Sequence, residues 1–283
     1  MIAATIPRAT SRRLVLIGAT SFALLSACRG DADGPRRAGA ASADSAARAE
    51  SYGDVVIAPP TAADRAVTVA TPGTVSGTVT LKEPLPVLPA VATGAASGLC
   101  GDSIADGSAQ VQGSGLAGAV VWLDGIRSGK ALGLERRLEL ESDHCRLTPR
   151  VQAAMVGSAV NIIGHDEFRQ HLRFTSGGET VPRAAILLGG GEQVIPTELP
   201  FKLPGMVAVR DPDHAWTRAY LAVFDHPYYA VSGTGGAFTI DGVPPGHYTL
   251  HAWHERTGPT TQSVDVAADG TVKVAVVLAG KQP

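Results

Sequence analysis

The sequence predicts an all-β domain, either a sandwich or a barrel, over most of its length. From Gly73 onward, short runs rich in β-branched residues recur roughly every ten to fifteen residues, each bounded by Gly or Pro. The chain has 33 Gly and 19 Pro among 283 residues, above the combined share of about 12% in an average protein, which indicates many turns. No long helical hydrophobic period interrupts these runs, so the prediction contains no substantial helix.

The first 27 residues have the three parts of a secretory signal. Basic residues precede the apolar run 14–25, and small residues follow it. The apolar run is too short to span a bilayer comfortably. We therefore expect residues 1–27 to be a signal peptide and the protein to be exported.

Cys28 ends the sequence Leu25-Ser26-Ala27-Cys28, which resembles a bacterial lipobox. The resemblance implies that Cys28 is lipidated and becomes the first mature residue, so the predicted membrane partner is reached through a lipid anchor. An ordinary signal with a chance cysteine is the alternative. Arg29 stands where an Asp would favour the inner membrane, so the expected location is the outer membrane, facing the periplasm. The pair Arg12-Arg13 resembles a twin-arginine motif, and the choice between this route and the general secretory route stays open.

Residues 28–70 are predicted to be a disordered tether. They consist mainly of Ala, Gly, Ser, Arg and Asp, with few large apolar side chains. Such a segment cannot bury enough surface to offset the entropy lost on ordering.

The charge balance excludes an electrostatic nucleic-acid binder. The chain has 24 basic and 26 acidic residues, a formal charge of −2. The predicted signal holds three Arg and no acid, so the mature chain has 21 basic and 26 acidic residues and a charge of −5. Nucleic-acid binding would need an excess of basic groups.

Two cysteines remain after the anchor, Cys100 and Cys145. In an oxidising compartment they are expected to form one disulfide, which closes a loop of about 45 residues. A metal-binding thiolate is the alternative, but neither cysteine has the CxxC or CxxH neighbours of such sites.

Two segments resemble known families. Residues 235–250, with the sequence GGAFTIDGVPPGHYTL, resemble the hairpin of carboxypeptidase-regulatory-like, transthyretin-type modules. Residues 145–166 are similar to bacterial cupredoxin-like proteins related to methylamine-utilisation and plastocyanin-like proteins. The resemblance implies an antiparallel Greek-key β-sandwich over about 71–280, cupredoxin-like over about 71–230 and carboxypeptidase-regulatory-like over about 219–280. A fold of this kind says little about function.

The cupredoxin resemblance implies a degenerate type 1 copper site. Such a site needs two imidazoles, a thiolate and a weak axial donor. Alignment with the family's C-x-x-H-x-x-x-M pattern places Asp211 at the thiolate, His214 at the histidine, and Thr217 or Arg218 at the axial position. Without the thiolate, blue-copper electron transfer is not expected.

Another metal site remains a hypothesis. The resemblance implies that several polar side chains gather at one end of the sandwich, where imidazoles and a carboxylate would bind copper or zinc. The candidate ligands are His165, His171, Asp211 and His214, with Asp166 beside them. The alternative is a group of polar surface residues left after the loss of an ancestral site.

Other motifs carry weaker signals. The glycines at 189–191 lack the setting of a phosphate-binding loop and are read as a flexible turn. The sequence HAWHE at 251–255 is read as the end of a strand with an aromatic core anchor. No nucleophile elbow of the G-x-S-x-G type occurs.

These observations predict a non-catalytic exported lipoprotein, a binding or structural module at the bacterial cell envelope. Its partner would be an envelope protein or polysaccharide, and no cofactor is required. The alternative is a copper- or zinc-binding cupredoxin-like protein that uses His171 and His214.

Overall fold

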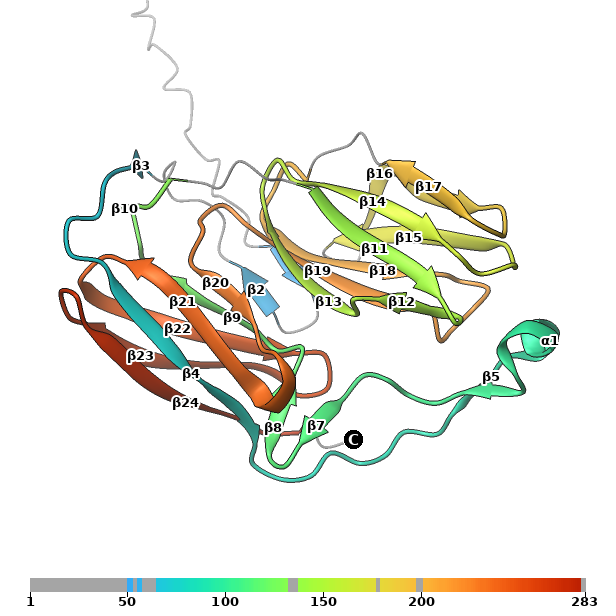
Figure 1. Cartoon of the computed structure of the whole chain (residues 1–283), viewed down its shortest axis with the longest axis horizontal. Helices are drawn as coiled ribbons and strands as arrows, with labels where there is room; N and C mark the ends of the chain where they lie inside the picture. The colour runs from blue at the N-terminus through green and yellow to red at the C-terminus, as the bar shows by residue number, and fades with distance from the viewer. Residues whose placement is uncertain are drawn as a thin grey trace, which may run out of the picture. The chain divides into compact units, whose positions relative to one another are not determined.

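The protein is described by a computed structural model over residues 50–52, 55–57, 65–131, 137–176, 179–196 and 201–280. The predicted signal peptide and Cys28 lie outside these residues. Within them the predicted all-β sandwich architecture is confirmed, because strands make up nearly all regular structure (Figure 1). The helical elements in this part of the chain are short: η1 (Gly94–Ala96), α1 (Ser97–Cys100) and η2 (Thr234–Gly236).

Two sheets form what we call the outer sandwich. The first contains β4 (Gly73–Leu81), β7 (Gln110–Gln112), β8 (Gly115–Ala117), β21 (Ala237–Val243) and β24 (Thr271–Leu278). The second has the order β20 (Tyr229–Val231), β9 (Val120–Asp124), β22 (Gly246–His254) and β23 (Gly258–Val266). Between them lies an apolar core that includes Val75, Leu116, Leu123, Ile240 and Leu250.

Two further sheets form the inner sandwich. One has the order β12 (Arg146–Thr148), β11 (Arg137–Asp143), β14 (Ala159–Gly164) and β17 (Gln193–Pro196). The other has the order β13 (Val151–Met155), β19 (Arg218–Phe224), β18 (Gly205–Arg210), β15 (Gln170–Ser176) and β16 (Glu179–Leu188). Their core includes Leu140, Ile162, Phe174, Val209 and Leu221.

The inner sandwich is an insertion within the outer one. The outer sheets join strands from residues 73–124 to strands from residues 229–278, and the inner sheets use residues 137–224. The consecutive division predicted at about residues 219–230 does not match this pairing. Hydrophobic periodicity identifies strands, but it does not reveal which strands pair across a long insertion.

A third apolar layer joins the two sandwiches. Alternate residues of β9, β18 and β19 face opposite cores, so both faces of these strands are buried. The layer includes two aromatic pairs, Trp122 with Phe224 and Tyr220 with Trp253, with ring centroids 5.6 and 5.4 Å apart. Strands buried on both faces read as nearly continuous apolar runs, as the sequences of β18 and β19 do.

The sheets are mainly antiparallel, with parallel pairs among them. The described strands include four parallel pairs, β3 with β10, β4 with β24, β11 with β14, and β13 with β19. The connections between the strands of the last three pairs are long, as parallel pairing requires.

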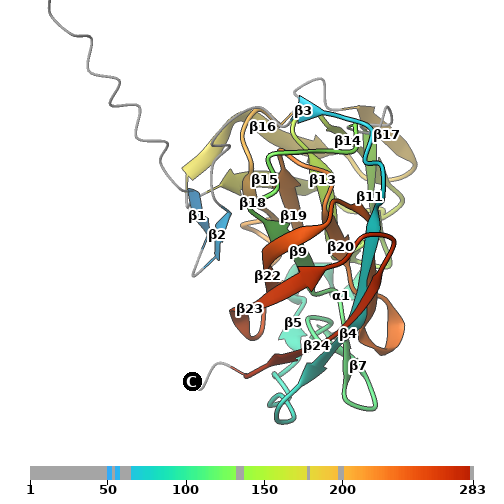
Figure 2. The same ribbon diagram turned by 90° about the vertical axis from the view of Figure 1, so that its left-hand side faces the viewer.

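Short strands also occur within the predicted tether 28–70. β1 (Glu50–Tyr52) and β2 (Val55–Ile57) form an antiparallel hairpin beside β18 (Figure 2). β3 (Arg65–Ala66) pairs with β10 (Ser128–Gly129). Residues 50–52, 55–57 and 65–66 of the predicted tether therefore form strands, because their backbone groups find hydrogen-bond partners.

A long excursion, residues 82–109, connects β4 to β7, and we call it the strap (Figure 1). It contains β5 (Val91–Ala92), η1, α1 and β6 (Ser103–Ile104). The predicted disulfide is present: Cys100 in the strap is bonded to Cys145 in the inner sandwich, with Cα atoms 5.8 Å apart. Trp216 of the inner sandwich packs in the same small apolar cluster as Cys145 and the strap side chains. The strap is thus fixed to the inner sandwich.

The outer sandwich also holds the strap, through Arg256 in the turn between β22 and β23. Its Nη1 donates to the Asp106 carboxylate and to the Ser108 hydroxyl, both at 2.9 Å. Its Nη2 donates to the Pro86 carbonyl at 2.7 Å. The Arg256 guanidinium therefore contacts the strap both near its beginning, at Pro86, and near its end, at Asp106 and Ser108.

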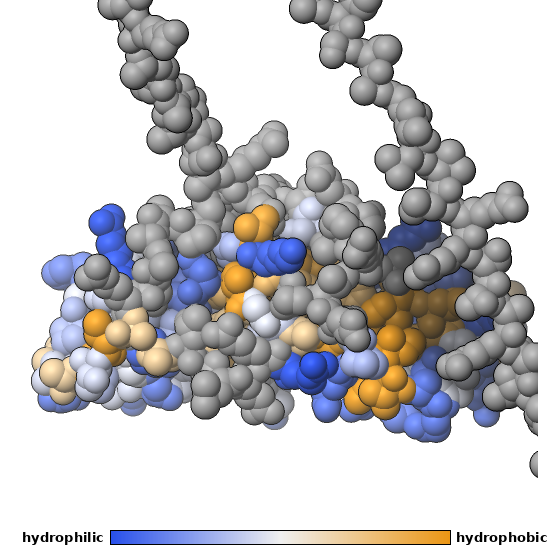
Figure 3. Space-filling view, turned by 90° about the horizontal axis from the view of Figure 1, so that it is seen from above, coloured by the Kyte–Doolittle hydropathy of each residue, from blue (hydrophilic) through white to orange (hydrophobic). Residues whose placement is uncertain are grey.

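No helix in the described part of the chain is long and apolar enough to cross a membrane. Large apolar side chains that are exposed include Val87, Leu99, Val194 and Leu203. They come from separate loops and strands, and single exposed apolar residues of this kind are normal for a protein surface. On the face shown in Figure 3, some hydrophobic residues lie singly among hydrophilic ones and others gather at the right of the view.

Candidate functional site

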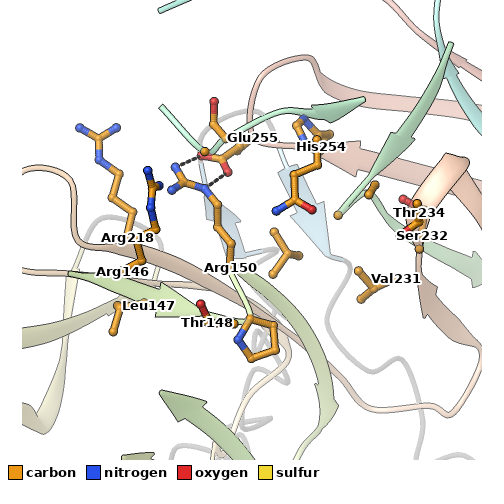
Figure 4. Close-up of a pocket in the computed structure, with 18 of the residues that line it drawn as sticks. Arg146, Leu147, Thr148, Arg150, Arg218, Val231, Ser232, Thr234, His254 and Glu255 are labelled. Carbon is orange, nitrogen blue, oxygen red and sulfur yellow. Dashed lines mark hydrogen bonds and ion pairs between the residues drawn. The ribbon is translucent and has the colours of Figure 1, made fainter. Parts of the chain in front are cut away.

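A pocket of about 390 Å³ lies where the strap, the outer sandwich and the inner sandwich meet. This volume is within the range of about 300–1,000 Å³ typical of small-molecule sites. Its lining is rich in basic and hydroxyl side chains, and Figure 4 labels ten of the residues. The lining includes Gln110, Arg146, Leu147, Thr148, Arg150, Val151, Trp216, Arg218, Val231, Thr234, His254 and Glu255.

The three arginines reach the pocket from the inner sandwich. Arg146 is the first residue of β12, Arg150 directly precedes β13, and Arg218 is the first residue of β19. Because β13 and β19 pair in parallel, their starting ends lie at the same edge of the sheet. In Figure 4 the three side chains extend in the same direction from these strands.

Arg150 forms a buried ion pair with Glu255 of the outer sandwich. Its Nε and Nη2 donate to the two carboxylate oxygens at 2.5 and 2.9 Å, and the side chains are 17% and 6% exposed. Burial acts to lower the pKa of Arg150, but the hydrogen bond and the charge of Glu255, aided by Tyr220 and Asp106, raise it overall. The pair is bidentate, which fixes both side chains.

His254 lines the pocket beside Glu255 and is 1% exposed. Its Nδ1 accepts a hydrogen bond from the Arg256 backbone N–H at 3.2 Å. Burial, followed by the charges of Arg256 and Arg150, lowers the pKa of His254 to about 4. The imidazole is therefore neutral at pH 7 and adds no positive charge to the pocket.

We expect His254 to make the protein sensitive to acid. Its pKa of about 4 in the folded chain lies below the ordinary value of 6.5, so the unfolded chain binds the proton more readily between these values. This contribution to stability is complete above about pH 6.5 and is lost as the pH falls towards 4, amounting to about 3 kcal/mol.

Urea unfolding at pH 7 and at pH 4 measures this loss. In the His254→Asn variant the loss between the two pH values should be smaller by about 3 kcal/mol than in the wild type. His247, whose side chain is 90% exposed, provides the control: His247→Asn should keep the wild-type pH dependence. An unchanged pH dependence in His254→Asn would show that this imidazole does not resist protonation.

The charges of the pocket do not balance. Arg146, Arg150 and Arg218 contribute three positive charges, Glu255 contributes one negative charge, and His254 is neutral. Two positive charges are left in a chain whose predicted mature form has a net charge of −5. The pocket therefore suits an anionic group.

The predicted metal ligands make hydrogen bonds to neighbouring protein groups. No group of three or more His, Cys, Asp or Glu side chains within the described ranges is arranged to hold a metal ion. His165 pairs instead with Glu192, at 2.8 Å from Nδ1 to Oε1, and this hydrogen bond raises the pKa of His165. Metal binding by these four residues stays a prediction.

Asp211 and its neighbours form a structural hydrogen-bond cluster. The Asp211 carboxylate is buried and accepts from the backbone N–H of His171 at 3.0 Å and of Asp213 at 2.9 Å, and it also pairs with His214 Nδ1 at 2.7 Å. The His171 ring pairs separately with Asp213, which lowers the pKa of Asp213. Asp166 likewise receives the Ser142 hydroxyl and the Cys145 backbone N–H. These carboxylates hold turns in place and are engaged with protein donors.

The pocket residues were missed from the sequence. The sequence predicts only the end of a strand at His254 and Glu255, and the three arginines belong to no motif. Arg150 and Glu255 are 105 residues apart in the chain, so no local spacing marks their contact. Only the fold brings them together.

Comparisons with known proteins support the fold of the C-terminal part. The model of the carboxypeptidase regulatory-like domain, a β-sandwich, matches residues 207–279. The match confirms the predicted resemblance in this part and begins within β18 of the inner sandwich. Comparison with curated protein sequences finds no significant match.

Among solved structures, the chain is similar to a Cu-containing nitrite reductase from Thermus scotoductus SA-01. The identity is 17% and the TM-score is 0.26, over 34% of this chain and 24% of that protein. The similarity thus spans about a quarter of the length of the reductase.

Proposed function

We propose that this protein is a non-catalytic lipoprotein that is exported and anchored to the bacterial cell envelope through Cys28. Its sandwiches act as a binding module for an envelope protein or polysaccharide, at the outer membrane facing the periplasm. The observation that carries the binding role is the arginine-lined pocket with its two uncompensated positive charges. Three sequence features support the proposed export and anchoring: the basic n-region, the apolar run 14–25 and the lipobox-like residues before Cys28.

The acid–base groups of the pocket favour binding over catalysis. Both carboxylate oxygens of Glu255 accept hydrogen bonds from Arg150. His254 has a pKa of about 4 and its Nδ1 accepts from a backbone N–H. A general base that operates at pH 7 needs a pKa nearer to 7 and an available lone pair.

A copper- or zinc-binding cupredoxin-like protein with a degenerate type 1 site is the second candidate. It would use His171 and His214, whose Nδ1 atoms pair with Asp213 and Asp211. Among the described residues, no contact of His171 or His214 favours it over the first candidate.

The lipid anchor can be tested by fractionating bacteria that produce the full chain. We expect the wild type in the membrane fraction, with mass spectrometry showing a lipid on Cys28 as the first residue. Cys28→Ser should leave the membrane fraction, and Arg29→Asp should move the protein from the outer to the inner membrane. Equal partitioning of the wild type and Cys28→Ser would refute the anchor.

A further inference from the structure

We infer that the pocket binds the carboxylate of an acidic sugar, such as a uronic acid unit of an envelope polysaccharide. The inference rests on the proposed function in taking the protein to be a binding module, and it does not depend on the lipid anchor. It follows from three features of the pocket: its available guanidinium groups, its neutral polar and apolar lining, and its size.

The available guanidinium groups belong to Arg146 and Arg218. Each uses one nitrogen to bind a backbone carbonyl: Arg146 Nη2 donates to Ala105 and Arg218 Nε donates to Ala215, both at 2.9 Å. Their other N–H groups have no hydrogen-bond partner among the described residues. Two N–H groups on one edge of a guanidinium can donate in parallel to the two oxygens of a carboxylate, which gives a bidentate pair.

Arg150 is held differently and has a supporting role. Its Nε and Nη2 are occupied by Glu255, which neutralises most of its charge within the pocket. A ligand carboxylate would therefore bind to Arg146 and Arg218 rather than compete with the Glu255 carboxylate. The Arg150–Glu255 pair keeps the two sandwiches together behind this site.

The rest of the lining suits a sugar ring better than a bare ion. Gln110, Thr148 and Thr234 supply neutral groups that can donate to and accept from hydroxyls. Apolar surface against which the C–H face of a sugar can pack comes from the half-buried side chains of Val151 and Val231, one from each sandwich. A small inorganic anion would leave this surface unused.

The size of the pocket limits what can enter. A volume of about 390 Å³ lies at the lower end of the range for small-molecule sites. It therefore suits one or two sugar units, and a longer chain would extend from it into solvent. The strap residues Gly107 and Ser108 line the pocket next to Gln110 of β7, so the disulfide-bonded strap helps to define the site.

The test is isothermal titration calorimetry on the full chain in detergent micelles, at pH 7 and low salt. The probes are trigalacturonic acid, its fully methyl-esterified form, sodium acetate and inorganic phosphate. We expect trigalacturonic acid to bind at least about tenfold more tightly than the ester, because esterification removes the charge and leaves the rings. Acetate and phosphate should bind more weakly than the acidic sugar.

Matched arginine variants locate the binding. Arg146→Gln and Arg218→Gln should each weaken trigalacturonic acid binding by about tenfold or more. Arg137→Gln removes the same charge from β11, where Arg137 contacts Asn161 outside the pocket, and should leave affinity unchanged. Melting curves at the same pH should show that the three variants remain folded.

Several results would overturn the inference. Equal binding of the acid and its ester would show that the carboxylate is not recognised, and phosphate binding as tight as the sugar would show a simple anion site. Wild-type affinity in both pocket variants would place the binding elsewhere. Failure of the lipidation test with successful titration would refute the anchor alone, whereas the reverse would refute the sugar site alone.

Discussion

Replacing Glu255 with Gln should destabilise the protein by about 3–5 kcal/mol, the largest effect we expect from a single change at the pocket. The substitution removes the carboxylate that pairs with Arg150 but leaves the guanidinium buried, with its side chain 17% exposed. Removing one partner of a buried ion pair leaves an unpaired charge and strongly destabilises the fold. Replacing both partners with apolar residues often changes the stability little. Urea unfolding monitored by tryptophan fluorescence would measure the difference.

Two further variants make this prediction specific. The double variant Arg150→Met/Glu255→Leu removes both charges and should recover most of the stability lost in Glu255→Gln. Asp143→Asn removes a carboxylate that is 46% exposed and lies beside His144, and it should cost less than about 1 kcal/mol. A Glu255→Gln variant within 1 kcal/mol of the wild type would show that the ion pair contributes little.

Loss of the Cys100–Cys145 disulfide should cost about 4 kcal/mol. The bond joins residues 45 positions apart, and the chain-entropy model assigns roughly this free energy to closing such a loop in the unfolded chain. The Cys100→Ser/Cys145→Ser variant should therefore unfold at lower urea concentration. Limited proteolysis should also cut it within the strap, because the hydrogen bonds of Arg256 and Arg146 and the small apolar cluster around Trp216 would then hold this segment without a covalent link.

The same measurement on the wild type with and without a reducing agent provides the control. Reduction should lower the stability of the wild type to that of the double variant and should not change the variant itself. An equal unfolding midpoint for the wild type and the double variant would refute the prediction.

The strands could be predicted from the sequence because each leaves a local pattern. Runs such as 74–81 and 247–253 fall within β4 and β22, and the glycines and prolines between runs lie in turns. Gly236 shows why glycine marks such a turn. It has a φ of +81°, and a Cβ there would lie 2.1 Å from the Val79 carbonyl oxygen. Only glycine fits this close approach between η2 and β4.

The nesting of the sandwiches and the composition of the pocket could not be predicted in the same way. Both depend on contacts between distant parts of the chain, such as Arg150 with Glu255 and Arg256 with Asp106, 105 and 150 residues apart. The hydrogen bonds of the candidate metal ligands could not be predicted for a related reason. Spacing alone cannot show that Asp211 turns its oxygens towards backbone N–H groups.

The insertion also sets an order in which the chain can become structured. All strands of the inner sandwich come from one continuous stretch, 137–224, whereas β4 acquires its neighbours β21 and β24 only after residue 237 has been made. Contacts that close large loops form late, because the entropy of closure must be overcome first. Until then the edge of β4 that pairs with β21 lacks its partner, and an unpaired strand edge can pair with other chains. We therefore expect a nascent or truncated chain that ends before β21 to aggregate more readily than the complete chain.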